Sequence, residues 1–205
     1  MAQPTRGPNS EAMQEREESP RSPALAMATR DLYGARTVLI FGEVDTALAE
    51  RVSAQLLALA ASGPEPIKVL LHSPGGHVEA GDTIHDVLRY IGAPVLILAS
   101  GWVASAGALI YVAVPRERRL ALPNTRFMLH QPLGGAGGPA SDVEIEARQI
   151  LLMRARLNRI FADATGQPYE KVLRDTDRNH WLTAEEAVAY GLVSRIVRTE
   201  AEGST

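Results

Sequence analysis

The sequence predicts an α/β domain built on parallel strands. Short β-branched runs alternate along the chain with stretches whose apolar residues recur at helical spacing. Two apolar runs, 67–73 (IKVLLHS) and 94–100 (PVLILAS), each lead through a turn into a helical stretch, as in a parallel sheet with crossover helices. The chain has 205 residues, which is enough for one well-buried domain and too few for two ordinary ones.

The first two thirds of the chain supply the alternating elements. They are a strand at 36–44, a helix at 45–63, a strand at 67–73, a helix at about 80–91, a strand at 94–100, a small-residue helix at about 104–113 and a strand at 126–132. Asp45 or Thr46 can cap the first of these helices, and Gly63 stops it. We expect right-handed crossovers to stack these units.

Two further helices carry boundary signals of their own. The helices at 142–164 and 183–191 each begin with an S/T-x-x-E capping box and each end at a glycine. The residues concerned are Ser141, Glu144 and Gly166 for the long helix, and Thr183, Glu186 and Gly191 for the short one.

Composition narrows the classes of function. A formal net charge of −3 and a pI near 6.0 give no electrostatic case for nucleic acid or a membrane as a partner. The chain contains no cysteine, which excludes disulfides, thiolate metal sites and a cysteine nucleophile. We expect no metal and no cofactor, and a chain without cysteine fits a cytoplasmic location.

The two ends of the chain differ in composition from its centre. Residues 1–30 are rich in Pro, Ser, Glu and Arg, with no apolar stretch long enough for a signal peptide, so we expect a disordered or removable extension. We expect the folded domain at 31–198 and a flexible tail at 199–205. The apolar stretch 93–114 is broken by glycine and serine, and a buried strand followed by a buried helix explains it better than a membrane span.

Two turns in the first half of the chain are candidate parts of an active site. The segment 72–81 (HSPGGHVEAG) follows a strand and opens a helix, so its backbone amides suit a developing oxyanion, or it is only a tight turn. The segment 101–110 (GWVASAGALI) repeats this arrangement and places Ser105 near a helix start, with the Ala106 amide as a second donor. The alternative is a tightly packed helix whose serine bonds back to its own turn.

A base and an orienting group are available later in the chain. His130 ends the strand in RFMLHQP, and the carboxyl ends of strands in an open α/β sheet lie together, so Ser105 and His130 can come within hydrogen-bonding reach. The segment 173–181 (LRDTDRNHW) offers Asp175, Asp177 and Asn179 to orient the imidazole. Taken singly, the histidine is compatible with a structural role, and this segment with a solvated loop.

Several segments together resemble the ClpP family, the proteolytic subunits of ATP-dependent Clp proteases, over about residues 34–197. They are SPGG followed by V-x-A-G, AS-x-GAL, LPNTRFMLHQPLGG, ASDVEIEARQIL, TGQPYEKVLRDTDR and LTAEEAVAYGLV, in matching order and spacing. The resemblance implies a crotonase-like α/β fold of repeated ββα units with a protruding strand–helix handle. It also implies a serine peptidase of two stacked seven-membered rings, which receives peptides and unfolded proteins from a partner AAA+ unfoldase.

The resemblance also assigns catalytic roles. It implies Ser105 as the nucleophile, His130 as the general base, and the amides of Gly76 and Ala106 as the oxyanion hole. An ungapped count from His130 places the family's catalytic aspartate at Asn179, which has no charge to stabilise an imidazolium. We therefore expect a weak, conditional or assembly-activated peptidase.

The resemblance extends to the surfaces that contact other subunits. The long helix from about residue 142 matches the handle that joins the rings, and Asp177 and Arg178 match residues of the ring–ring contact. Lys68 and Leu70 replace aromatic residues that usually line the unfoldase-docking pocket, while Tyr90 keeps an aromatic nearby. The resemblance also implies that Trp102 and Ala106 replace the more usual glutamine and methionine around the nucleophile, so we expect a different shape on the S1 side of the cleft.

Three functions therefore compete. The leading one is a Clp-type serine endopeptidase that works through an acyl-enzyme on Ser105. The second is a nearly silent ring subunit that assembles with and regulates an active paralogue, motivated by Asn179 and the altered docking strand. The third is a crotonase-type acyl-CoA enzyme, which uses similar oxyanion amides but relies on acidic residues rather than a serine–histidine pair.

Overall fold

Strands β2 (Ile67–Ser73) and β3 (Val95–Ala104) form the centre of a seven-stranded sheet. The strand order is β1-β2-β3-β4-β7, and β5 pairs with the second half of β3 and with β6. All pairs are parallel except β5 with β6. This computed structural model describes residues 23–135 and 137–203.

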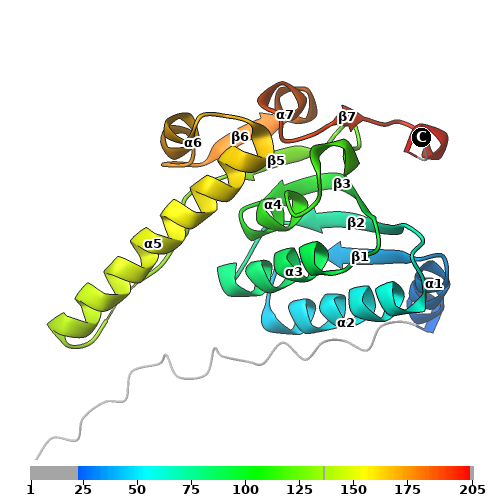
Figure 1. Cartoon of the computed structure of the whole chain (residues 1–205), viewed down its shortest axis with the longest axis horizontal. Helices are drawn as coiled ribbons and strands as arrows, with labels where there is room; N and C mark the ends of the chain where they lie inside the picture. Colours follow the sequence, from blue (N-terminus) through cyan, green and yellow to red (C-terminus); the bar gives the residue numbers. More distant parts are fainter. Residues whose placement is uncertain (1–22, 136, 204–205) are drawn as a thin grey trace, which may run out of the picture.

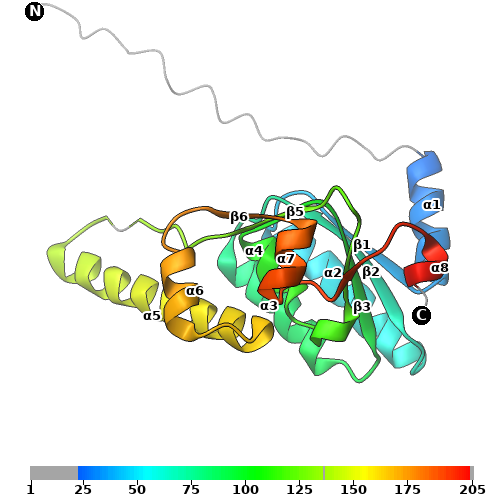
Figure 2. The same ribbon diagram turned by 90° about the horizontal axis from the view of Figure 1, so that it is seen from above.

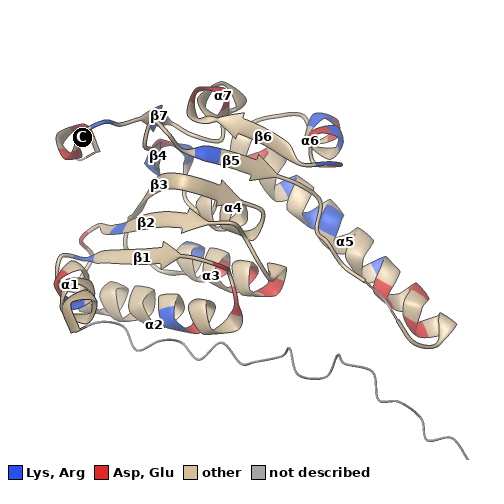
Figure 3. Ribbon diagram, turned by 180° about the vertical axis from the view of Figure 1, so that it is seen from behind, with Lys and Arg blue, Asp and Glu red and all other residues tan. Residues whose placement is uncertain are grey.

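The helices lie mainly on one face of the sheet. Figure 1 shows α2, α3 and α4 packed against this face, and Figure 3 shows the opposite face of the strands from behind. The remaining strands are β1 (Thr37–Phe41), β4 (Arg119–Ala121), β5 (Arg126–Leu129), β6 (His180–Thr183) and β7 (Arg195–Ile196). The helices are α1 (Pro23–Gly34), α2 (Thr46–Ser62), α3 (Val78–Tyr90), α4 (Ala106–Tyr111), the 3₁₀ turn η1 (Arg116–Arg118), α5 (Ala140–Thr165), α6 (Tyr169–Asp175), α7 (Ala184–Tyr190) and α8 (Glu200–Gly203).

The core lies between the sheet and these helices. In β2, Ile67, Val69 and Leu71 alternate as buried residues with partly or fully exposed neighbours, as expected where only one face of a strand is covered by helices. From α2, Val52 and Leu56 have no exposed surface and belong to the same core. This burial is the main source of stability for a fold of this kind.

The expected α/β fold is confirmed, with strand β2 at the residues that the sequence predicts. Strands β4, β6 and β7 and helices α1, α6 and α8 were not expected as elements. These three strands have two to four residues each and depend on pairing with a neighbour. They are too short to show a periodic pattern in the sequence.

Helix boundaries follow the expected caps in all but one case. The side chain of Asp45 accepts a hydrogen bond from the amide of Leu48 at 2.7 Å, and Thr183 and Glu186 form a complete capping box. The expected box of Ser141 and Glu144 is wrong. Helix α5 begins earlier, at Ala140, with Pro139 in extended geometry (φ −57°, ψ 149°) at the N-cap position, so Ser141 lies inside the first turn.

Helix α5 is a handle that projects from the body of the protein. Figures 1 and 2 show its first half extending beyond the sheet, with the chain that leads into it running alongside. Only its last third contributes buried residues, among them Leu157 and Phe161. The helix of the expected strand–helix handle is therefore present, whereas residues 130–135 and 137–139, which lead into it, form no strand.

The two ends of the described chain are helical. Residues 23–30, expected within the extension, form most of α1, which contributes no buried residue. Residues 200–203, expected within the tail, form α8, where the amide of Arg198 donates to the Glu202 carboxylate at 2.7 Å. Residues 1–22 lie outside the described residues, so the expectation of a disordered or removable segment there stays a prediction.

Candidate active site

Ser105 sits at the sharp turn between β3 and α4. Its backbone has φ 55° and ψ −122°, a conformation that non-glycine residues rarely adopt. The Ser105 amide donates to the carbonyl of Met128 on the neighbouring strand β5 at 2.9 Å, which helps to hold the turn. The serine side chain caps no helix amide, so the bond back to its own turn is not formed and Oγ is directed elsewhere.

His130 is the partner of this hydroxyl. The distance from Ser105 Oγ to His130 Nε2 is 2.7 Å. His130 follows β5, which pairs with the end of β3, so the parallel register brings the two side chains together. The expected serine–histidine pair is therefore present as a hydrogen-bonded unit.

Burial governs the protonation of this histidine. Desolvation lowers the pKa of His130 below its ordinary 6.5, and a side-chain hydrogen bond with Asn179 opposes this effect. The imidazole is therefore neutral at pH 7. Since Nε2 faces the serine, Nδ1 is the nitrogen left for Asn179, which is the arrangement a general base needs.

The two nearby aspartates are engaged elsewhere. Asp175 accepts hydrogen bonds from Lys171 at 2.6 Å and from the Tyr190 hydroxyl at 2.8 Å. Burial raises the pKa of Asp175, but these two donors outweigh it, and the net pKa is lowered. Asp177 pairs with Arg154 of α5 at 2.9 Å. Asn179 is the member of this segment whose side-chain hydrogen bond acts on the pKa of His130.

A glycine turn packs directly behind the serine. A Cβ on Gly75, which has φ +97°, would come within 2.6 Å of the Ser105 Cβ and 3.1 Å of the Ala106 nitrogen. Gly76 forms a parallel bridge with Val44, and a Cβ there would come within 2.2 Å of the Val44 carbonyl. Both positions require glycine for close approach as well as for conformation.

Two backbone amides beside the serine are free to bind an oxygen. In the bridge with Val44, the flanking groups make the hydrogen bonds: Val44 donates to the Gly75 carbonyl and His77 donates to the Val44 carbonyl, both at 2.8 Å. The Gly76 amide therefore points the other way. Ala106 opens α4, where first-turn amides have no intrahelical acceptor. Neither amide donates to another residue within the part of the chain that the structure describes.

Aromatic side chains connect β3, which leads to Ser105, with β6, which follows Asn179. The rings of Trp102 and Trp181 stack with centroids 5.7 Å apart, and the Arg126 guanidinium lies 4.5 Å from the Trp181 ring centroid. Trp102 and Arg126 are opposite each other in the β3–β5 register. Trp181 was not singled out from the sequence; its signal is its place two residues after Asn179, on the strand that pairs with β5.

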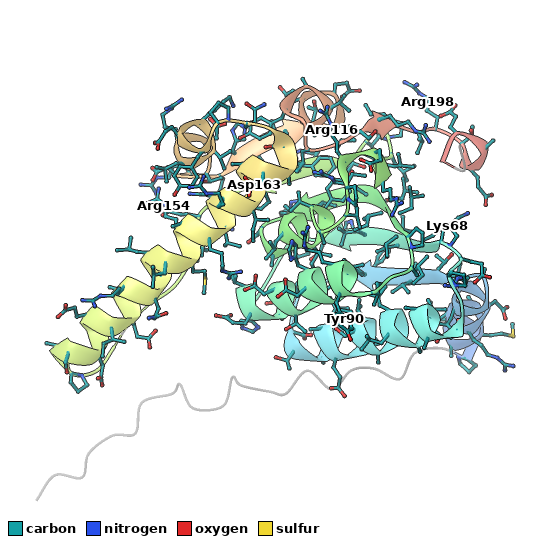
Figure 4. The ribbon with its side chains drawn as sticks, viewed as in Figure 1. Lys68, Tyr90, Arg116, Arg154, Asp163 and Arg198 are labelled. Atoms are coloured by element: carbon teal, nitrogen blue, oxygen red, sulfur yellow. The ribbon has the colours of Figure 1, made fainter. Side chains whose placement is uncertain are left out.

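The residues expected to dock an unfoldase border a hollow that does not include Ser105. Lys68 and Leu70 line a hollow of about 470 Å³ that the C-terminal segment also borders. Tyr90, at the end of α3, is 81% exposed and does not line this hollow, so it does not replace the missing aromatics (Figure 4). Arg178, beside Asp177, is exposed.

Residues 23–135 and 137–203 contain neither a membrane-spanning helix nor a cluster of metal ligands. None of the helices there combines the length and the apolar character needed to span a bilayer. No group of three or more His, Asp or Glu side chains in those ranges is arranged to hold a metal ion.

Comparison with known proteins identifies the family. A model of the Clp protease family matches residues 21–200. The ATP-dependent Clp protease proteolytic subunit 3 of Rhizobium etli is 59% identical over 172 residues, covering 84% of this chain and 89% of the relative. The proteolytic subunit 2 of Pseudomonas aeruginosa is 54% identical over 167 residues, covering 82% and 83%.

Solved structures agree with the sequence relatives. An asparagine-to-aspartate mutant of ClpP1 from Listeria monocytogenes superposes with a TM-score of 0.81 at 49% identity, covering 87% of this chain and 99% of that one. The unmutated Listeria ClpP1 gives 0.77 at the same identity. These relatives are proteolytic subunits rather than acyl-CoA enzymes, and the chain, with its hydrogen-bonded serine and histidine, belongs to the Clp protease family.

Proposed function

We propose that this chain is a serine endopeptidase subunit in which Ser105 is the nucleophile. The observation that carries the proposal is the 2.7 Å contact between Ser105 Oγ and a neutral, partly buried His130 Nε2. A serine hydroxyl is a weak nucleophile by itself and needs an adjacent base. The histidine supplies that base in the reactive geometry.

The proposed reaction proceeds through an acyl-enzyme. Ser105 Oγ attacks the peptide carbonyl while His130 Nε2 takes its proton, and the carbonyl oxygen becomes an oxyanion bound by the amides of Gly76 and Ala106. Collapse of this intermediate breaks the peptide C–N bond, and His130 returns the proton to the leaving amine. Water then attacks the ester by the same route, and the peptide acid and the free serine are released.

With Asn179 as its partner, His130 is a weaker general base than the histidine of a triad that contains aspartate. The side-chain oxygen of Asn179 can accept the Nδ1–H of His130 and so hold the useful tautomer, which fits the hydrogen bond between the two residues. Asn179 carries no charge to stabilise the imidazolium that forms during attack. In a trypsin-like triad the aspartate-to-asparagine change costs about 10⁴ in kcat, so we propose low or conditional activity.

We further propose assembly into two stacked seven-membered rings fed by an AAA+ unfoldase in the cytoplasm. The exposed apolar surface of the handle supports this proposal. Leu133, Leu151 and Leu152 there are 83%, 63% and 59% exposed. Monomeric soluble proteins rarely leave such an apolar patch in contact with water. Asp177 and Arg178 would contribute to the ring–ring contact beside the handle. The hollow at Lys68 and Leu70 would be the docking site for the unfoldase.

A second function is favoured by two of these observations. With Asn179 at the triad and Lys68 at the docking hollow, the chain would serve as a nearly silent subunit that assembles with an active paralogue and regulates it. In mixed rings, such a subunit would alter the partner's activity without using its own serine.

Hydrolysis of fluorogenic peptides separates the two functions. The protein is assayed alone and in rings mixed with an active relative, each with the native chain or with Ser105→Ala. The endopeptidase proposal predicts that the native chain alone hydrolyses the peptide, that Ser105→Ala abolishes this activity, and that mixed rings lose part of their activity when they carry Ser105→Ala. Activity of mixed rings that is unchanged by Ser105→Ala, with none from the chain alone, would establish the silent role.

A further inference from the structure

A second hollow, of about 670 Å³, opens on the helical side of the protein. It lies between the end of α3, the turn η1 and the C-terminal end of α5, and it shares no lining residue with the Ser105 site. Figure 4 labels two of its residues, Arg116 at the turn before β4 and Asp163 on α5. Its volume falls within the range of small-molecule sites.

The lining of this hollow is strongly basic. Arg89, Arg116 and Arg119 line it against one carboxylate, that of Asp163. None of these three arginines forms an ion pair within the described ranges, whereas Arg154 and others on the handle do. Three guanidinium groups around one hollow produce a positive potential that only an external anion would neutralise fully.

Arg119 gives the hollow a rigid, buried floor. Arg119 is only 3% exposed. Its two terminal guanidinium nitrogens donate to the carbonyls of Leu192 at 3.3 Å and Ala164 at 2.8 Å. Its Nε is buried and has no hydrogen-bond acceptor among the residues that the structure describes. Backbone carbonyls orient a guanidinium without cancelling its charge, and a buried donor without an acceptor is costly.

The electrostatics of Arg119 agree with an unneutralised site. Burial lowers the pKa of Arg119, and Arg116 lowers it further through charge repulsion, while Tyr111 and Glu117 oppose these effects. Repulsion between two arginines is a strain that a bound anion between them would relieve.

We propose that this hollow binds a phosphate-type oxyanion, either free or as the phosphate group of a nucleotide. Phosphate oxygens match the paired donors of guanidinium groups, and several arginines around one hollow suit a diphosphate better than a single carboxylate. Asp163 opposes the anion and limits its affinity. Because Arg119 links the end of α5 to the segment after α7, an occupied site also stabilises the base of the handle.

Calorimetric titration of the assembled protein with inorganic pyrophosphate tests the proposal, at constant ionic strength set with chloride. Arg116→Gln should weaken binding at least about tenfold, the loss of one charge-assisted hydrogen-bond pair. Asp163→Asn should tighten it, because it removes the carboxylate of the lining. Arg118→Gln is the matched control: it lies on the same turn but lines a different hollow, and should leave the affinity unchanged.

Adenosine diphosphate in the same titration distinguishes the two sources of phosphate. Competition with pyrophosphate means that a nucleotide fits the hollow, and failure to compete restricts the site to small inorganic anions. Thermal unfolding, monitored in parallel, should show a pyrophosphate-dependent rise in melting temperature for the native chain and a smaller rise for Arg116→Gln. The proposal would be overturned by any of three results. They are no binding of pyrophosphate at millimolar concentration, an equal loss of pyrophosphate affinity in Arg116→Gln and Arg118→Gln, or a lower affinity in Asp163→Asn.

Discussion

At the scale of single residues, the reactive geometry depends on an unusual backbone at Ser105. A non-glycine residue at positive φ costs on the order of 1–3 kcal/mol, so the surrounding structure has to impose it. The hydrogen bond from the Ser105 amide to Met128 and the close packing of Gly75 supply that constraint. The result is a hydroxyl that is presented to His130 rather than to its own helix.

Restoring the charge at the third position should activate the enzyme. Asn179→Asp places a carboxylate beside His130 that stabilises the imidazolium formed during attack, so we predict a rise in kcat of more than about tenfold. The measurement is peptide hydrolysis by the purified assembly, with Asp175→Asn as control, because Asp175 is held by Lys171 and Tyr190. An unchanged kcat in Asn179→Asp would mean that the missing charge does not limit catalysis.

The same histidine sets the response to pH. Since burial lowers the pKa of His130 below 6.5, the acid limb of kcat/KM should lie below pH 6.5, with full activity at pH 7. Because the pKa of His130 is lower in the folded protein than in the unfolded chain, the unfolded chain binds the proton more readily. The contribution of His130 to the free energy of unfolding is therefore present above pH 6.5 and is lost as the pH falls through the pKa of the folded protein. In Asn179→Asp the limb should move to higher pH. A limb at the same pH in both proteins would argue against contact between the two side chains.

At the scale of elements, the site depends on short strands that leave almost no periodic pattern in the sequence. Strand β6 follows Asn179 directly and pairs with β5, while its Trp181 stacks on Trp102 of β3. This stack connects the strand that leads to Ser105 with the segment that carries Asn179. Stacked aromatic pairs contribute about 0.5–1.5 kcal/mol beyond the area they bury.

Loss of this stack should impair catalysis without unfolding the protein. Trp181→Ala leaves the segment after Asn179 less firmly held, so we predict a several-fold fall in kcat and a modestly lower melting temperature. Trp181→Phe preserves a ring and should retain most of the activity. The comparison requires peptide kinetics and thermal unfolding on both variants; a native kcat in Trp181→Ala would show that the stack does not position the site.

Elements encoded by neighbouring residues were predictable from the sequence, whereas features that depend on distant groups were not. Strand β2 and the Thr183 capping box were predictable because each is encoded by neighbouring residues. The start of α5 was not, because Pro139 takes the N-cap position in extended geometry and overrides the local Ser141 signal. Likewise the residues alone offered three partners for His130, and the choice depends on distant groups, such as Tyr190, which binds Asp175.

At the scale of the whole molecule, the handle is the feature that a single isolated chain does not explain. Two ion pairs at its inner half fix its direction: Arg156 binds both oxygens of Asp82 on α3 at 2.7 and 2.6 Å, and Arg154 binds Asp177. Its outer half carries exposed apolar residues instead. A rigid projection with an uncovered apolar face suits contact with another subunit.

Charge on that face should separate the rings. Leu152→Asp places a carboxylate on a position that is 59% exposed in the single chain, so its fold should be unaffected while ring stacking is lost. Leu57→Asp, on the exposed side of α2, is the control. Native mass spectrometry should show single rings or smaller species for Leu152→Asp and native assembly for Leu57→Asp. Native assembly in both variants would show that this part of the handle is not an interface.

Covalent labelling of the assembled protein with a fluorophosphonate tests the central claim most directly, because this reagent phosphonylates serines that an adjacent base activates. Peptide mass spectrometry should locate the adduct on Ser105, with no adduct in Ser105→Ala and much slower labelling in His130→Ala. A correctly assembled native protein that leaves Ser105 unmodified, or an adduct that persists in Ser105→Ala, would contradict the account.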